Sequence, residues 1–144
     1  FARTREQRAA LIRRHIADNH EDGEGTLAVT LKESGQFIGQ AGLQLYILTW
    51  PPFATPEVEL YYKLGRDFWG QGYAEEACRA LIDFAFNTMH LLRLVTITQP
   101  DNRHSVRLLK RLGFSVAPGP ANWHPEVMAI LVNPECGTAP PTGK

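Results

Sequence analysis

Three glycines in the stretch GRDFWGQGYAEEA, residues 65–77, are the first residues whose spacing could carry chemistry. Gly65, Gly70 and Gly72 follow the strand-like run VELYYKLG and precede the helix-like run YAEEACRALIDFAF. Glycines between a strand and a helix often let backbone N–H groups close around an anion such as a phosphate. The stretch predicts such an anion cradle, while a turn that needs glycine only for its geometry is an equally good explanation.

Two known phosphate-binding loops fit this stretch poorly. The dinucleotide fingerprint G-x-G-x-x-G matches Gly70 and Gly72, but Glu75 stands at its third glycine. The Walker loop G-x-x-x-x-G-K-S/T matches the spacing from Gly65, but Gln71 and Gly72 replace its lysine and hydroxyl. A cradle of backbone N–H groups remains, to which a helix dipole adds roughly half a positive charge. Glu75 opposes an anion, so we expect it to point away.

A second group of polar residues lies in QPDNRHSVRLLKRLGF, after the strand-like run RLVTITQ. Asn102, Ser105 and Leu109 are spaced i, i+3 and i+7, so they share one face of a helix. Asn102 and Ser105 would lie at the helix start, at the carboxyl end of a strand, where open sheets place ligands. Each alone is explained as a helix cap or a first-turn residue. Together, facing the glycine stretch, they favour a binding site.

Periodicity and turn residues predict the elements that must position these groups. They are a helix over residues 4–18, a hairpin of TLAVTLK and FIGQAGLQLYIL, a loop in TWPPFATPE, a strand in VELYYKL, a helix over residues 73–89, a strand in RLVTITQ, a short helix stopped by Gly113 and a strand in EVMAILV. Because a run of strands precedes the alternation with helices, the order favours an α+β fold with a mixed sheet over a doubly wound parallel one.

Composition limits the class of protein. The chain of 144 residues can build one domain with a proper core. Its 15 Lys and Arg balance 15 Asp and Glu, so no overall field favours nucleic acid or an anionic membrane as partner, and no apolar run is long enough to span a membrane. Cys78, Cys136 and the histidines lack the spacing of a disulfide framework or a metal site. We therefore predict no metal and a reducing, cytoplasmic compartment.

The joined runs VELYYKLGRDFWGQGYAEEACRALIDFAF and RLVTITQPDNRHSVRLLKRLGF resemble the GNAT superfamily of acetyl-CoA-dependent N-acetyltransferases. Within this superfamily the chain looks most like the RimJ/RimL type, which acetylates ribosomal-protein N-termini and, in relatives, small amines. The resemblance extends from about Thr26 to Val132 and is most specific in WGQGYAEEA and DNRHSVRLLKRLGF. It implies a central mixed, mostly antiparallel sheet flanked by helices, with two parallel strands that splay apart to form the CoA cleft. We expect one acetyltransferase domain over residues 1–132, with its first strand missing, and a tail over residues 133–144.

The resemblance also implies how CoA would be held. The family pattern Gln/Arg-x-x-Gly-x-Gly/Ala falls on Trp69 to Ala74, with an aromatic first residue that is typical of the RimJ/RimL branch. The backbone of Tyr62 to Leu64 would pair with the pantetheine arm, and Asn102 would bond this arm from the other side. The implied CoA-binding residues are Tyr62, Leu64, Trp69, Gly70, Gln71, Gly72, Tyr73, Ala74, Asn102 and Ser105.

The implied reaction is direct attack of a primary amine on acetyl-CoA. Many family members carry a tyrosine, the acid for the leaving thiolate, where this chain has Leu109, which cannot donate a proton. Ser105, one turn earlier, would take this role, as in the RimJ/RimL branch. Glu59 and, less directly, Glu57 are candidate bases, although a solvated or paired strand carboxylate explains Glu59 equally well.

The acceptor amine, of a protein N-terminus or a small molecule, is left open by the sequence, and so is a homodimer. The alternative function is a regulatory module that binds CoA or acyl-CoA without transferring the acyl group, because Leu109 replaces the usual acid.

Overall fold

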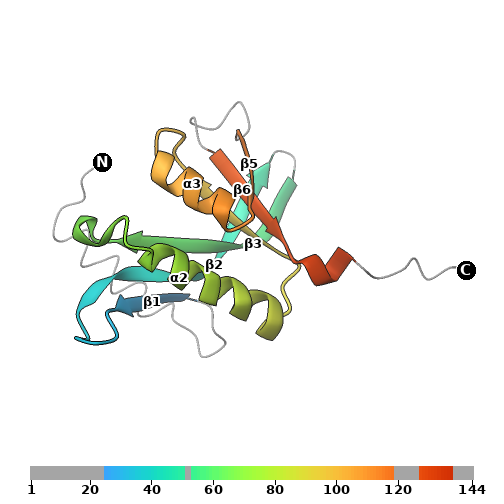
Figure 1. Ribbon diagram of the computed structural model, residues 1–144. Helices are drawn as coiled ribbons and strands as arrows, with labels where there is room; N and C mark the ends of the chain where they lie inside the picture. The colour runs from blue at the N-terminus through green and yellow to red at the C-terminus, as the bar shows by residue number, and fades with distance from the viewer. Residues whose placement is uncertain (1–24, 51–52, 119–126, 138–144) are drawn as a thin grey trace, which may run out of the picture.

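The computed structural model describes residues 25–50, 53–118 and 127–137 (Figure 1). The helix expected over residues 4–18 lies outside them. The elements are β1 Gly25–Thr30, β2 Phe37–Trp50, β3 Phe53–Leu64, the 3-10 turn η1 Arg66–Phe68, α2 Tyr73–Asp83, the π-helical turn η2 Phe84–Thr88, β4 Arg93–Thr98, α3 Arg103–Arg111, β5 Ser115–Pro118, β6 Val127–Val132 and the 3-10 turn η3 Pro134–Gly137.

The six strands form one sheet in the order β1-β2-β3-β4-β6-β5. Every neighbouring pair is antiparallel except β3 and β4, which are parallel. This confirms the predicted mixed, mostly antiparallel α+β fold. β3 and β4 are paired only at Glu59 and Val95, although they continue to Leu64 and Thr98. The two parallel strands therefore part beyond Glu59, as expected.

Both long helices lie on the same face of the sheet, α2 against β2 and β3 and α3 beside β5 and β6 (Figure 1). The core between sheet and helices contains fully buried side chains from each layer, such as Leu60 of β3, Cys78 of α2 and Leu94 of β4. Burying a leucine stabilises a fold by about 1.5–3 kcal/mol. Leu109 of α3 is 1% exposed and belongs to this core, so it is a packing residue.

The predicted loop TWPPFATPE is wrong, because β2 and β3 form a long hairpin in which Trp50 pairs with Phe53. Its prolines suggested a loop, since proline cannot donate a hydrogen bond to a ladder. Pro56, however, lies in the part of β3 that precedes its pairing with β4. A sheet edge of this kind tolerates proline.

Two further elements differ from expectation. The helix predicted over residues 73–89 is α-helical only to Asp83, after which Met89 N–H reaches back five residues to the Phe84 carbonyl (3.0 Å). The strand β5 was not expected, because its four residues are too few to show a period. It pairs with β6 and is the edge strand on that side of the sheet.

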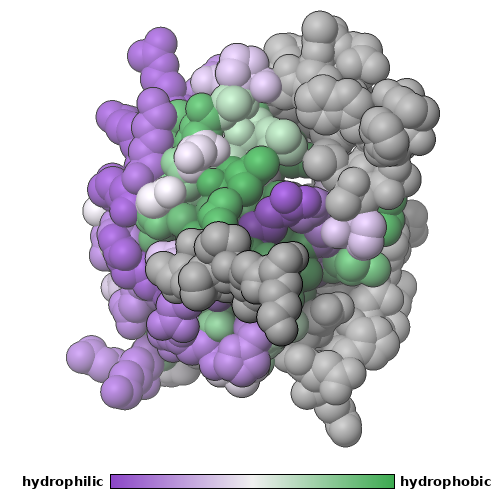
Figure 2. Space-filling view, turned by 90° about the vertical axis from the view of Figure 1, so that its right-hand side faces the viewer, coloured by the Kyte–Doolittle hydropathy of each residue, from purple (hydrophilic) through white to green (hydrophobic). Residues whose placement is uncertain are grey.

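The surface has a hydrophobic area on the side turned to the viewer in Figure 2, bordered by hydrophilic residues. Large apolar side chains that are exposed include Leu45 and Ile47 of β2 and Leu92 before β4. Within residues 25–50, 53–118 and 127–137, none of the helices combines the length and the apolar character that crossing a bilayer requires.

Candidate functional site

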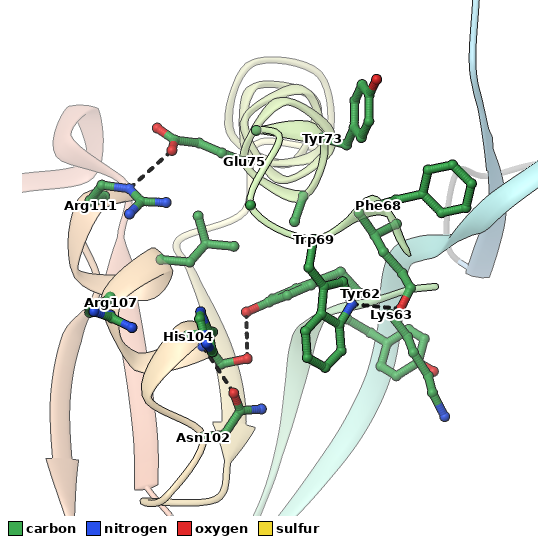
Figure 3. Close-up of a pocket in the computed structure, with 17 residues that line it drawn as sticks. Tyr62, Lys63, Phe68, Trp69, Tyr73, Glu75, Asn102, His104, Arg107 and Arg111 are labelled. Carbon is green, nitrogen blue, oxygen red and sulfur yellow. Dashed lines mark hydrogen bonds and ion pairs between the residues drawn. The ribbon is translucent and has the colours of Figure 1, made fainter. Parts of the chain in front are cut away.

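A cleft of about 620 Å³ opens where β3 and β4 part (Figure 3). Its walls are the end of β3, the turn between β3 and α2, the first turn of α2 and one side of α3. All of the predicted CoA-binding residues line this cleft except Gln71, whose side chain donates to the Asp67 carbonyl (2.9 Å). The structure thus brings the two motifs, which lie about thirty residues apart in the chain, to one cavity.

The turn before α2 depends on two glycines in the left-handed region. Gly70 has φ 73° and Gly72 has φ 86°, and a Cβ on either would meet no protein atom within 4 Å. Glycine is thus required by the backbone conformation, and the space beside it is open to a ligand. Gly72 is the N-cap of α2 without a side-chain cap, and the first N–H bonded back to it is that of Glu76 (3.0 Å). The backbone N–H groups that precede Glu76 have no acceptor within α2, so they can bind an anion.

Trp69 spans part of the cleft mouth. Its indole N–H donates to the Leu64 carbonyl (3.0 Å), and its ring centroid lies 6.2 Å from that of His104 on the opposite wall. The Arg66 guanidinium lies 5.8 Å from the same ring, within reach of a cation–π contact. Trp69 thus occupies one of the β3 carbonyls that were expected to pair with the pantetheine arm.

The charged residues of the cleft are mostly basic. Lys63, Arg107 and Arg111 line it together with one carboxylate, Glu75. The expectation that Glu75 points away was wrong: it faces the cleft and accepts from Arg79 (2.8 Å) and Arg111 (3.1 Å; Figure 3). The Arg79 hydrogen bond, with the nearby Arg111, lowers the pKa of Glu75. Glu75 therefore stays ionised, and these two arginines offset its repulsion of an anion.

Ser105 is hydrogen-bonded to both Asn102 and Tyr62. Asn102 caps α3, its Oδ1 accepting from the Ser105 backbone N–H (3.2 Å). The Tyr62 hydroxyl donates to Ser105 Oγ (2.9 Å) across the cleft (Figure 3). Burial raises the pKa of Tyr62, so the phenol is protonated at neutral pH. The family resemblance implied only a backbone role for Tyr62. The alternation in VELYYKL, which puts Tyr62 on the same face as buried Leu60, could have indicated a role for its side chain.

The candidate bases lie apart from this group. Glu59 does not line the cleft; it accepts from Gln44 Nε2 (2.6 Å), and strand alternation places it on the sheet face opposite to Tyr62. Glu57 is 6% exposed and forms a two-pronged ion pair with Arg93. The pairing gives Glu57 a structural role between β3 and β4, while the role of Glu59 stays a prediction. Within the described ranges, no cluster of three His, Cys, Asp or Glu side chains could hold a metal ion.

Comparison with known proteins identifies the family. The model of the acetyltransferase (GNAT) domain matches residues 1–115, and the chain therefore belongs to this family. An uncharacterized N-acetyltransferase, p20, of Bacillus licheniformis is 33% identical over 87 residues, which are 60% of this chain and 46% of that protein. The chain spans about half the length of the curated relatives it matches.

Solved structures agree with this fold. An acetyltransferase of Agrobacterium tumefaciens is 31% identical with a TM-score of 0.73, covering 90% of this chain and 72% of that one. The ribosomal-protein-serine acetyltransferase of Vibrio cholerae, described as putative, has a TM-score of 0.69 at 22% identity, covering 90% of this chain and 75% of that one. At this identity the second likeness concerns the fold alone.

Proposed function

We propose that this chain is the acetyl-CoA-binding domain of an N-acetyltransferase that transfers an acetyl group to a primary amine. One observation carries the proposal: the N–H cradle at the start of α2 opens into the same cleft as Asn102 and Ser105, where β3 and β4 part. A backbone cradle suits a pyrophosphate, and a gap between parallel strands offers backbone groups to an extended, amide-containing arm.

The residues of the cleft fit CoA. The N–H groups from Trp69 to Ala74 would hold its pyrophosphate, and Arg107 and Lys63 add positive charge nearby. The backbone of Tyr62 to Leu64 would pair with the pantetheine arm once the Leu64 carbonyl is shared with or released by Trp69. Asn102 would bond the arm from the side of α3. The bound cofactor supplies an acetyl group activated as a thioester.

Ser105 would act as the hydrogen-bond donor for the departing sulfur. As the new N–C bond forms and the C–S bond breaks, one proton leaves the amine and one is gained by the departing thiolate. Ser105 is a cleft residue at the start of α3, whereas Leu109 is in the core and cannot serve. Glu59, on the opposite sheet face where the strands begin to part, would accept the amine proton from an acceptor arriving on that side.

We assign the chain to the RimJ/RimL-type branch on its motifs WGQGYAEEA and DNRHSVRLLKRLGF, which makes a protein N-terminus or a small primary amine the acceptor. The active domain would extend over residues 1–132, and we infer a cytoplasmic protein. A CoA-binding module without transferase activity is not favoured by any contact in the cleft.

Calorimetry with acetyl-CoA and a thiol-release assay test the proposal together. We expect saturable binding of acetyl-CoA, and thiol release that depends on an amine from a panel of N-terminal peptides and polyamines. Mass spectrometry should find the acceptor heavier by one acetyl group. Absence of binding at millimolar acetyl-CoA would refute the CoA site, and binding without amine-dependent thiol release would refute the transferase.

A further inference from the structure

Tyr62 and Ser105 bring two hydroxyl groups together inside the cleft from opposite walls. Tyr62 lies on β3 beyond its pairing with β4, and Ser105 lies in the first turn of α3, 43 residues later. Their oxygens are 2.9 Å apart, and both side chains are half-buried. This bond is a direct side-chain link between the two elements that would hold the thioester.

In this bond the Tyr62 O–H is the donor and Ser105 Oγ is the acceptor. A serine hydroxyl has one proton and two lone pairs, and one lone pair of Ser105 is taken by the Tyr62 O–H. The Ser105 backbone N–H is bound to Asn102, so this residue is fixed at both its backbone and its side chain. Within residues 25–50, 53–118 and 127–137, no hydrogen bond from the Ser105 O–H to a protein acceptor is formed. Its proton is therefore available to a group in the cleft.

We infer that Tyr62 is a positioning residue, whose hydroxyl holds Ser105 so that the Ser105 O–H is presented to the thioester sulfur. The inference rests on the proposed function, in which Ser105 supports the leaving sulfur. A donor bonded to Ser105 Oγ also polarises the serine O–H, because hydrogen bonds in a chain strengthen one another. The tyrosine thus compensates in part for a leucine at the position where many family members carry the acid.

The first experiment is a double-mutant cycle in acetyl transfer with Tyr62→Phe, Ser105→Ala and both changes combined, using the fastest acceptor of the amine panel. Tyr62→Phe keeps the ring and removes one hydrogen bond, so kcat should fall about 10-fold while the KM for acetyl-CoA changes less than about twofold. Because Tyr62 acts through Ser105, the double variant should match Ser105→Ala alone. An unchanged kcat in Tyr62→Phe, or losses that multiply in the double variant, would overturn the inference.

The second experiment measures the same pair without acetyl-CoA. Urea unfolding of the four proteins gives the coupling between the two hydroxyls, which should be about 2- to 10-fold in the unfolding equilibrium constant. Zero coupling would show that the bond does not exist in the free protein and would overturn the inference whatever the activity. These results can be distinguished from a failure of the proposed function. In that case the wild type would transfer acetyl to no amine, although the coupling between the two hydroxyls is present in urea unfolding.

Discussion

Gly72 has a conformation that side-chain-bearing residues rarely adopt, and it begins the helix that points its N–H groups into the cleft. It lies in the turn between η1 and α2, where it is the N-cap of α2 with φ 86°. Holding a residue with a Cβ at such a φ lowers the free energy of unfolding by about 1–3 kcal/mol. The cost alone does not reveal a ligand site, so a second glycine with similar strain is needed for comparison.

Gly35, in the turn between β1 and β2, provides this comparison. It has φ 69°, and, as at Gly72, a Cβ there would meet no protein atom within 4 Å. We expect Gly72→Val and Gly35→Val to lower the free energy of unfolding by similar amounts, about 1–3 kcal/mol. Only Gly72→Val should weaken acetyl-CoA binding, by about 10-fold or more, since the cradle loses its shape and its space. Calorimetry checks this, and equal affinities in the two variants would contradict the assigned cradle.

Cys78 gives a prediction for alkaline pH. Burial, and secondarily the charge of Glu75, raises the pKa of this thiol from 9.0 to about 12. A raised pKa in the folded state stabilises the protein below pH 9 and loses this contribution as the pH rises toward 12. The difference between the two pKa values corresponds to on the order of 4 kcal/mol in the free energy of unfolding.

The variant Cys78→Ala removes this titration, although it also removes a buried side chain at every pH. We therefore compare slopes: between pH 8 and 11 under reducing conditions, the unfolding free energy should fall more steeply in the wild type than in Cys78→Ala. Urea denaturation at each pH provides the curves. Parallel curves would mean that the thiol ionises in the folded protein without penalty.

The ion pair of Glu75 and Arg111 connects α2 with α3 (3.1 Å) beside the cleft. Glu75 also holds Arg79 one turn further along α2. The acid thus lowers the positive potential of the cleft and at the same time orders one of its arginines. For an anionic ligand the first effect should dominate, because the pair is exposed and contributes little to stability.

The variant Glu75→Gln tests this balance. We expect it to bind acetyl-CoA about 2- to 5-fold more tightly at low salt, with the gain fading above about 0.5 M salt as screening shortens the range of the charges. Glu76→Gln is the matched control, since it removes the same charge at an exposed neighbouring position that does not line the cleft. Weaker binding in Glu75→Gln would show that ordering of Arg111 matters more than the charge.

Elements with a strong local pattern were predicted from the sequence, and those defined by contacts were not. The strand in VELYYKL and the two helices after it have a clear period, and their relative order was enough for the α+β fold. The extension of β2 and β3 to Trp50 and Phe53 was missed because the prolines of TWPPFATPE favour a loop. The bond of Tyr62 to Ser105 joins residues 43 positions apart, and no local period reports such a contact. Strand alternation places Glu59 on the face opposite to buried Leu60, and its role as a base stays a prediction.

The cleft exists because one sheet combines two antiparallel regions. β1, β2 and β3 form one antiparallel region, and β4, β6 and β5 form the other. The two regions are held together by the single β3–β4 pair, the Glu57–Arg93 ion pair and the helices packed over the joint. A ligand that enters the gap and contacts both regions should stabilise the entire fold.

Thermal unfolding with and without acetyl-CoA measures this coupling. A ligand that binds only the folded state at 100 times its Kd adds about 2.7 kcal/mol, which for a chain of this size corresponds to a rise in Tm of about 5–10 °C. ATP and NAD at the same concentration should raise Tm by much less, because the turn lacks the Walker lysine and hydroxyl and has Glu75 at the third glycine of the dinucleotide fingerprint. Gly72→Val should abolish most of the shift by acetyl-CoA. An ATP shift that equals the acetyl-CoA shift would instead mean that the cleft recognises a nucleotide phosphate chain and that the pantetheine arm contributes nothing.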